Sequence, residues 1–201
     1  MKEESIAIIL ARGGSKRLPR KNILDFNSKP LIAWTIEAAL KSNVFEKVLV
    51  STDDDEISSI AKSFGAEVPF LRETAADDIT PSSEATIVAL NQAENFWEKK
   101  FKVVSQLMAN CPLRDHVDIQ NAFNSFSNHK RISQISCFKF GWMMPWWALK
   151  LNANGEGERI FPEASNQRSQ DLPPLYCPTG AIWIAKREQL LKNKSYYMPE
   201  T

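Results

Sequence analysis

The residues best suited to chemistry lie close together in one short segment, residues 11–22. Two adjacent glycines, Gly13 and Gly14, let a backbone turn sharply and bring its N–H groups close to an anion. Arg12 and Lys21 supply cations that neutralise phosphate oxygens. The segment predicts a phosphate-binding loop, and the alternative is a glycine turn flanked by solvated cations.

Positive charge is concentrated in this segment and not in the chain as a whole. The formal net charge is +1 over 201 residues, which gives no general basic field and argues against a dedicated nucleic-acid binder. The clustered basic residues are Arg12, Lys16, Arg17, Arg20 and Lys21. The sequence therefore predicts a local anion site.

The loop differs from two common phosphate-binding motifs. The pattern G-x-x-x-x-G-K-[ST] of P-loop proteins is absent, and so is the G-x-G-x-x-G dinucleotide fingerprint. No G-x-S-x-G elbow and no Cys–His pair stands out either, so a covalent enzyme intermediate is not expected.

Buried strands are expected before the loop and farther along the chain. The continuous apolar run 6–10 is typical of a strand that is buried on both faces. Residues 47–50 and 102–104 repeat that character. Residues 67–71 predict a weaker strand, and Pro69 favours an edge position for it.

Helical patterns separate these strands. Pro30 suits the first position of a helix, Asp54 or Asp55 suits an N-cap, and Gly65 suits the residue after a helix end. The expected helices span residues 30–41, 55–64, 83–97 and 115–126. Strict alternation of strand and helix implies an α/β fold with an open, doubly wound, mostly parallel sheet. Ligands bind at the carboxyl ends of such strands, which is where the loop lies.

The alternation breaks after about residue 140. Residues 141–147 are rich in large apolar side chains, 152–157 suggest a turn, and strand-like residues resume at 180–185. We interpret 1–201 as one domain with an insertion at 140–177. Its Trp-rich surface either packs on its own core or forms a homodimer interface.

Other classes of protein are disfavoured by simple features. No apolar run is long enough to span a membrane, and the first residues do not resemble a signal peptide. Three cysteines and two histidines occur without a metal-binding spacing. A cytoplasmic protein without a zinc site is expected.

The loop carries a specific resemblance. Ala-Arg-Gly-Gly-Ser-Lys-Arg-x-Pro-x-Lys-Asn at 11–22 resembles the signature of the acylneuraminate (CMP-nonulosonic acid) cytidylyltransferases. Further similar segments follow in order at 29–36, 50–54, 70–72, 77–78, 82–83, 111–114, 168 and 180–182. The resemblance covers essentially the whole chain and implies a nucleotide-diphospho-sugar transferase-like fold.

The resemblance implies a reaction and a set of residues. CMP would pass from CTP to a nine-carbon acidic sugar, with Mg²⁺ on the phosphates and pyrophosphate leaving. The implied nucleotide-binding residues are Arg12, Gly13, Gly14, Ser15, Lys21, Asn22, Arg72 and Ser82. Arg12 and Lys21 would also stabilise the charge that develops during transfer. A surface position is the alternative for Arg72, and Asp53 and Asp54 suit a helix cap better than a metal site.

The implied sugar site departs from the family pattern. Arg168 is the residue expected to bind the sugar carboxylate, with a solvated arginine as the alternative. Met108–Asn110 stands where the sialic-acid enzymes commonly have Gln-Pro-Thr, and Gln106 is a substitute for that glutamine. Residues 177–180 replace an Arg-Pro-Asn-Gly segment. These changes favour a sugar other than N-acetylneuraminate, such as a legionaminate-like relative.

The metal ligands are not identified in this sequence. The family's Ile-Asp-Ile-Asp segment would lie beyond Thr201, and its carboxylates are expected there. Without those carboxylates, a catalytically impaired nucleotide-binding protein is one alternative. An octulosonate-type cytidylyltransferase and a nucleotidyltransferase for another NTP are the other two.

Overall fold

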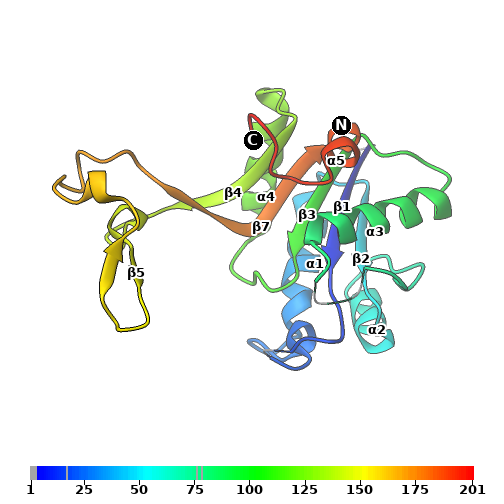
Figure 1. Ribbon diagram of the computed structural model, residues 1–201. Coiled ribbons are helices and arrows are strands. Elements are labelled where there is room, and N and C mark those ends of the chain that lie inside the picture. Colours follow the sequence, from blue (N-terminus) through cyan, green and yellow to red (C-terminus); the bar gives the residue numbers. More distant parts are fainter. Residues whose placement is uncertain (1–3, 17, 76, 78) are drawn as a thin grey trace. The chain divides into compact units, whose positions relative to one another are not determined.

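The computed structural model describes residues 4–16, 18–75, 77 and 79–201 (Figure 1). The chain divides into two compact units. Unit 1 contains the residues up to Ser136 together with Gly180–Thr201, and unit 2 is Cys137–Thr179. Two strands, β4 (Ser133–Lys139) and β7 (Tyr176–Lys186), run from one unit into the other.

The sheet has five strands in the order β2-β1-β3-β7-β4. Strand β1 (Ser5–Leu10) lies between β2 (Lys47–Ser51) and β3 (Val103–Met108) and is parallel to both, whereas β7 is antiparallel to β3. The expected mixed but mostly parallel α/β sheet is confirmed.

Strand β1 is buried because both of its faces are covered. Ile6 and Ile8 pack into one apolar cluster, while Ala7 and Ile9 pack into another on the opposite side of the sheet. This alternation follows from the period of two in a strand.

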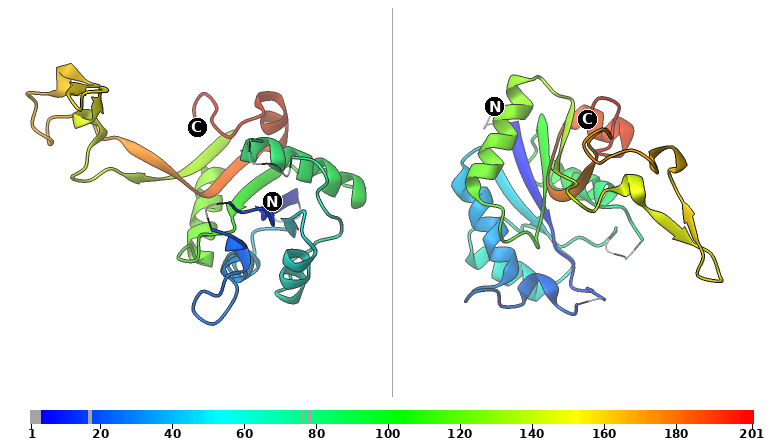
Figure 2. Two further views of the ribbon diagram at one scale, coloured as in Figure 1. Left: turned by 60° about the horizontal axis from the view of Figure 1, so that its bottom comes forward. Right: turned by 90° about the vertical axis from the view of Figure 1, so that its left-hand side faces the viewer.

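Helices form a layer on each side of the sheet. In order along the chain they are α1 (Leu31–Ser42), α2 (Asp55–Ser63), α3 (Ser82–Phe96), α4 (His116–Asn128) and α5 (Arg187–Asn193). Buried side chains of α1, α2 and α4 share one cluster, and those of α3 and α5 share the other. Figure 2 shows the sheet between these two layers. The doubly wound arrangement is therefore confirmed.

Helix ends agree closely with the capping residues in the sequence. The Asp54 carboxylate accepts a hydrogen bond from the Ile57 N–H and caps α2. Asp115 and Asp118 form a reciprocal capping box at the start of α4. Gly65 has a φ of +90° just after α2, which a residue with a side chain adopts only at a cost.

The strand expected at 67–71 is not formed, so that prediction is wrong. Glu67 alone pairs with Leu49 of β2 as an isolated bridge. Pro69 has no N–H with which to continue the ladder, and the chain leaves the sheet. It returns at Arg72, whose N–H donates to the Thr52 carbonyl at 2.7 Å.

Unit 2 contains a two-stranded hairpin of β5 (Leu149–Leu151) and β6 (Gly157–Arg159), joined by the turn expected at 152–157. The Trp146 and Phe161 rings meet edge to face at 5.1 Å. Trp142, by contrast, is 84% exposed. The tryptophans thus divide between internal packing and open surface.

Within the described ranges, no helix is both long and apolar enough to cross a membrane.

Candidate active site

The chain reverses its direction of travel across the sheet at β1. From β1 it passes to β2 on one side, and it later returns to β3 on the other side. Such a switch point leaves a crevice at the carboxyl ends of the two inner strands, where α/β proteins bind ligands. Leu10 and Met108, the last residues of β1 and β3, are register partners at this edge.

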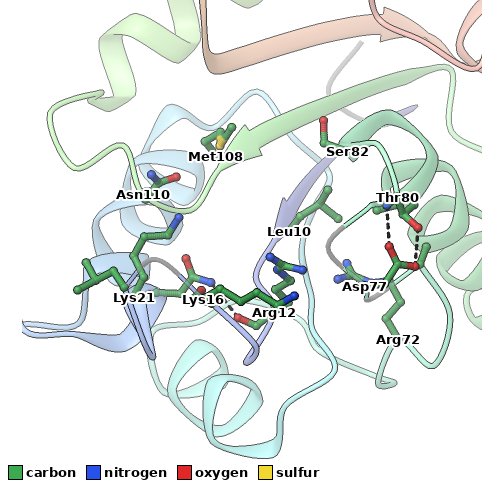
Figure 3. Close-up of a pocket in the computed structure, with 15 residues that line it drawn as sticks. Leu10, Arg12, Lys16, Lys21, Arg72, Asp77, Thr80, Ser82, Met108 and Asn110 are labelled. Atoms are coloured by element: carbon green, nitrogen blue, oxygen red, sulfur yellow. Dashed lines mark hydrogen bonds between the residues drawn. The ribbon is translucent and has the colours of Figure 1, made fainter.

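A pocket of about 550 Å³ lies at this edge (Figure 3). The loop after β1, the segment before α3 and the end of β3 surround it, and all of its lining belongs to unit 1. The lining residues are Leu10, Arg12, Ser15, Lys16, Leu18, Lys21, Asn22, Arg72, Ala75, Asp77, Thr80, Ser82, Ala85, Met108 and Asn110.

The pocket is strongly cationic. Four cations, Arg12, Lys16, Lys21 and Arg72, line it, while Asp77 is the one carboxylate among the described lining residues. A concave surface with one sign of charge concentrates oppositely charged ligands. The pocket therefore suits a polyanion such as a triphosphate.

The loop after β1 is closed on itself. Asn22 is buried, and its amide nitrogen donates to the Arg12 carbonyl at 3.2 Å. Figure 3 shows the side chains of Arg12, Lys16 and Lys21 on the same side of the pocket. The closed loop thus presents its cations together.

The two loop glycines have different structural roles. The Gly13 N–H donates to Asp53 Oδ1 at 3.0 Å, and a Cβ on Gly13 would lie 2.5 Å from Asp54 Oδ2. A Cβ on Gly14 would meet nothing within 4 Å, and neither glycine has a positive φ. Close packing therefore requires a glycine at position 13, and the Ser15 N–H donates to the Gly13 carbonyl at 3.0 Å, so the chain turns tightly at Gly14 without a positive φ.

Arg72 is buried and lines the pocket, so it is not a surface residue. Its guanidinium donates from Nη1 to the Ser51 carbonyl at 3.2 Å and to Ser51 Oγ at 3.1 Å, and its Nε has no hydrogen-bond partner among the described residues. Burial lowers the pKa of Arg72, while the Asp53 charge opposes this shift and the Arg12 charge adds to it. The group remains cationic at neutral pH, so an anionic or acceptor ligand suits it.

A tight turn that begins at Asp77 contributes Asp77 and Thr80 to the pocket lining. The Asp77 carboxylate accepts from the Ile79 N–H at 2.7 Å, and from the N–H and hydroxyl of Thr80 at 2.6 and 2.7 Å. The Thr80 backbone bond leads these contacts in lowering the pKa of Asp77 to about 2. Ser82, the first residue of α3, follows this turn into the pocket lining.

A second buried arginine holds the end of β3. Arg114 donates from Nη1 to the Ala181 carbonyl at 2.6 Å and from Nη2 to the Thr35 hydroxyl at 2.7 Å, and Thr35 in turn donates to the Met108 carbonyl at 3.0 Å. Burial lowers the pKa of Arg114 to about 10. These bonds fix the strand end from which Met108 and Asn110 face the pocket.

The structure brings most of the expected nucleotide-binding side chains together. Those that line the pocket are Arg12, Ser15, Lys21, Asn22, Arg72 and Ser82. Gly13 and Gly14 lie in the same loop without lining it. Their roles toward a nucleotide remain predictions.

The two residues expected on the sugar side have other partners in the structure. Gln106 is 2% exposed, and its amide oxygen accepts from the Thr86 hydroxyl at 2.8 Å. Arg168 belongs to unit 2 and pairs with both oxygens of Asp171, at 2.7 and 3.1 Å. Neither is among the pocket lining residues, and their roles toward the sugar remain predictions.

Sequence analysis did not single out several lining residues. Lys16 was named only as part of the basic segment and was not assigned to the nucleotide. Asn110 lies just after the end of β3, so its position at a carboxyl strand end was a usable signal. Thr80 had no such signal, because its place depends on the Asp77 turn. Arg17 lies outside the described residues.

The described residues do not fit a metal held by protein ligands alone. No three His, Cys, Asp or Glu side chains converge anywhere in the described part of the chain. Asp77 is occupied by its own turn, and Asp54 by its helix cap and the Arg20 guanidinium. The chemistry of the pocket is that of an anion-binding site.

Comparison with known proteins gives a consistent result. A family model described as "Cytidylyltransferase" matches residues 6–165. A pseudaminic acid cytidylyltransferase of Campylobacter jejuni is 33% identical, with 98% of this chain and 85% of the relative covered. A CMP-N,N'-diacetyllegionaminic acid synthase of Legionella pneumophila is 34% identical, with coverage of 98% and 84%.

A solved structure supports the fold independently. CMP:2-keto-3-deoxy-manno-octonic acid synthetase complexed with CTP matches with a TM-score of 0.67 at 19% identity, and 94% of this chain and 77% of that one are covered. At this identity the likeness concerns the fold. The sequence matches decide the family: this chain belongs to the cytidylyltransferases that include the CMP-nonulosonic acid synthases.

Proposed function

We propose that this protein transfers CMP from CTP to the anomeric hydroxyl of a nonulosonic acid and releases pyrophosphate. The observation that carries the proposal is the closed, cationic loop at the switch point of the sheet, in a chain of the cytidylyltransferase family. Relatives named for pseudaminic and legionaminic acids support a nine-carbon acidic sugar as the acceptor.

The phosphates are assigned to the loop after β1. The acceptor oxygen attacks the α-phosphorus in line, the bond to the β-phosphate breaks, and pyrophosphate leaves with its electron pair. Arg12 and Lys21 neutralise the charge that grows on the phosphoryl and leaving oxygens, and Lys16 adds a third cation. The hydroxyl of Ser15 supplies a further donor.

The cytidine is assigned to the side of the pocket where Arg72, Thr80 and Ser82 lie. Figure 3 shows this group across the pocket from Met108 and Asn110. Arg72 presents donors, whereas the Thr80 hydroxyl, which already donates to Asp77, keeps an oxygen that can accept. A base with both donors and acceptors on its edge suits such a mixed surface.

The acceptor sugar is assigned to the remaining side, next to Met108 and Asn110. Arg168 of unit 2 is a separate candidate, because its guanidinium binds the Asp171 carboxylate through the same fork that a sugar carboxylate would use. Gln106 would have to leave Thr86 to reach a substrate. We therefore rank Arg168 above Gln106 as a sugar-binding residue.

Magnesium, a homodimer and a cytoplasmic setting complete the proposal. Mg²⁺ prefers phosphate oxygens and would arrive with the triphosphate. The exposed Trp142 and Met143 of unit 2, 84% and 87% exposed, suit a contact between two copies. Cys111, Cys137 and Cys177 are not joined in disulfides, which agrees with a reducing compartment.

A pyrophosphate-release assay tests the function. The enzyme with CTP and Mg²⁺ is offered acids of the eight-carbon and nine-carbon 2-keto-3-deoxy classes. Release that depends on a nine-carbon acid supports the proposal. Release with the eight-carbon acid alone favours the octulosonate alternative, and CTP binding without release favours an impaired nucleotide-binding protein.

The Lys21→Ala variant tests the loop assignment. We expect loss of CTP-dependent turnover with an unchanged fold, and Lys62→Ala, an exposed lysine of α2, is the control. Full turnover by Lys21→Ala would remove that residue from the mechanism.

A further inference from the structure

The acidic start of α2 contacts both ends of the phosphate loop. At the first end, the Gly13 N–H donates to Asp53 Oδ1, and Gly13 packs so closely on Asp54 that a Cβ would collide with its carboxylate. At the other end, Arg20 Nη1 pairs with Asp54 Oδ2 at 2.5 Å, and Nη2 contacts Asp54 Oδ1 at 3.2 Å. Arg20 Nη2 also pairs with Glu56.

Arg20 does not line the pocket, although it belongs to the basic segment of the loop. It is not among the lining residues of the pocket, because its guanidinium is held by the Asp54 and Glu56 carboxylates. Its backbone has a φ of 56°, a left-handed conformation that is unusual for a residue with a long side chain. A conformation of this kind persists when the surroundings hold it in place.

The held residue directly precedes the pocket side chains. The Arg20 carbonyl accepts from the Ile23 N–H at 3.0 Å and so begins the short 3-10 turn Lys21–Ile23. Lys21 of this turn lines the pocket, and Asn22 donates to the Arg12 carbonyl. The chain of contacts thus runs from α2 through Arg20 to both principal cations of the loop.

We propose that Arg20 is a positioning residue, and that Asp54 with Glu56 clamps the phosphate loop in the form that binds the nucleotide. The inference rests on the proposed use of CTP. Misplacement of transferring groups by about 1 Å costs on the order of a hundredfold in rate, so a loosened clamp affects catalysis without contacting the substrate.

Two variants break the contact between Arg20 and Asp54 while leaving the cap of α2 in place. Asp54→Asn removes the charge that pairs with Arg20 but keeps an amide oxygen, which caps a helix about as well as aspartate does. Arg20→Gly keeps the left-handed backbone accessible and removes the guanidinium. Arg131→Ala, a change at an exposed arginine after α4, is the matched control.

The experiment measures CTP affinity by calorimetry, steady-state KM and kcat, and the melting temperature. We expect Arg20→Gly and Asp54→Asn each to weaken CTP binding and to lower kcat/KM for CTP by about tenfold, because the loop cations are then no longer held in place. The double variant should be no worse than either single one, because both changes break the same contact. Arg20→Lys should recover part of the loss, and the control should behave as wild type.

Two outcomes would overturn the clamp. One is CTP affinity within about twofold of wild type in both single variants, and the other is a double variant whose loss equals the product of the single losses. Wild-type protein that fails to bind CTP would instead overturn the proposed function. If Arg20→Gly fails to fold, Glu56→Gln removes the second carboxylate and leaves the loop sequence intact.

Discussion

Two buried arginines of unit 1 contrast in what surrounds them. Arg114 donates to the Ala181 carbonyl and the Thr35 hydroxyl, and it joins three elements that the sequence keeps far apart. Arg72 is also buried, but it donates to the carbonyl and the hydroxyl of Ser51 and lines the pocket. The comparison teaches that burial alone does not separate a structural cation from a ligand-binding one. Within the described residues both arginines leave Nε without a hydrogen-bond partner, and they differ in that Arg72 lines the pocket whereas Arg114 does not.

The largest expected effect is on stability at Arg114. Arg114→Ala leaves the Ala181 carbonyl and the Thr35 hydroxyl without their charged donor, which should cost on the order of 3–5 kcal/mol. Urea unfolding measures this loss. Leu113→Ala, at a neighbour that is 89% exposed, is the control and should change stability by about 0.5 kcal/mol or less. An Arg114 variant as stable as that control would contradict the structural role.

The next effect is on binding at Arg72. Arg72→Ala should weaken CTP binding by about tenfold to a hundredfold, because a charged hydrogen bond contributes about 1.5–3 kcal/mol. Its loss of stability should be smaller than that of Arg114→Ala, since fewer protein partners are left behind. Titration calorimetry measures the CTP affinity of both arginine variants, and urea unfolding measures their stability. If both variants lose the same amount of affinity and of stability, the contrast between the two arginines is wrong.

A smaller effect is expected at Gly180, next to the carbonyl that Arg114 binds. Its φ is +71°, and a Cβ there would lie 3.0 Å from Met108 Cε. Gly180→Ala should therefore cost about 1–3 kcal/mol and displace Met108, which lines the pocket. We expect KM for the acceptor sugar to rise more than KM for CTP, and an unchanged sugar KM would argue against Met108 on the acceptor side.

The smallest effect concerns the turn beside Arg72. The folded pKa of Asp77 is lowered to about 2, led by the Thr80 backbone bond, from an ordinary value near 3.8. The contribution of the turn is therefore present above pH 3.8 and is lost only as pH falls through about 2. An NMR titration of the Asp77 carboxyl should show no midpoint between pH 5 and 3. A midpoint in that interval would mean that the turn is open.

The sequence alone predicted the parts of the fold that depend on local patterns. Continuous apolar runs predicted β1, β2 and β3, and Asp54 and Asp115 marked helix starts because their side chains cap nearby N–H groups. The weak strand at 67–71 failed, since ladder pairing depends on a partner strand and Pro69 cannot continue it.

The candidate site was predictable in kind but not in detail. The segment at 11–22 combined glycine with clustered cations, so an anion loop followed from residue types alone. Nothing local indicated that Arg20 would turn away to Asp54 while Lys21 faces the pocket. That choice depends on a helix more than thirty residues later in the chain.

By itself the sequence determined the alternation of elements, their caps, the anion-binding chemistry and the family resemblance, because each is carried by neighbouring residues. Only the tertiary structure decided which cations face the pocket. It also decided that Arg72 lines the pocket while Arg114 binds the Ala181 carbonyl, and that Gln106 pairs with Thr86. The physical reason is that a long charged side chain can reach several partners, and folding selects among them by burial and by the acceptors that distant elements bring within hydrogen-bond distance.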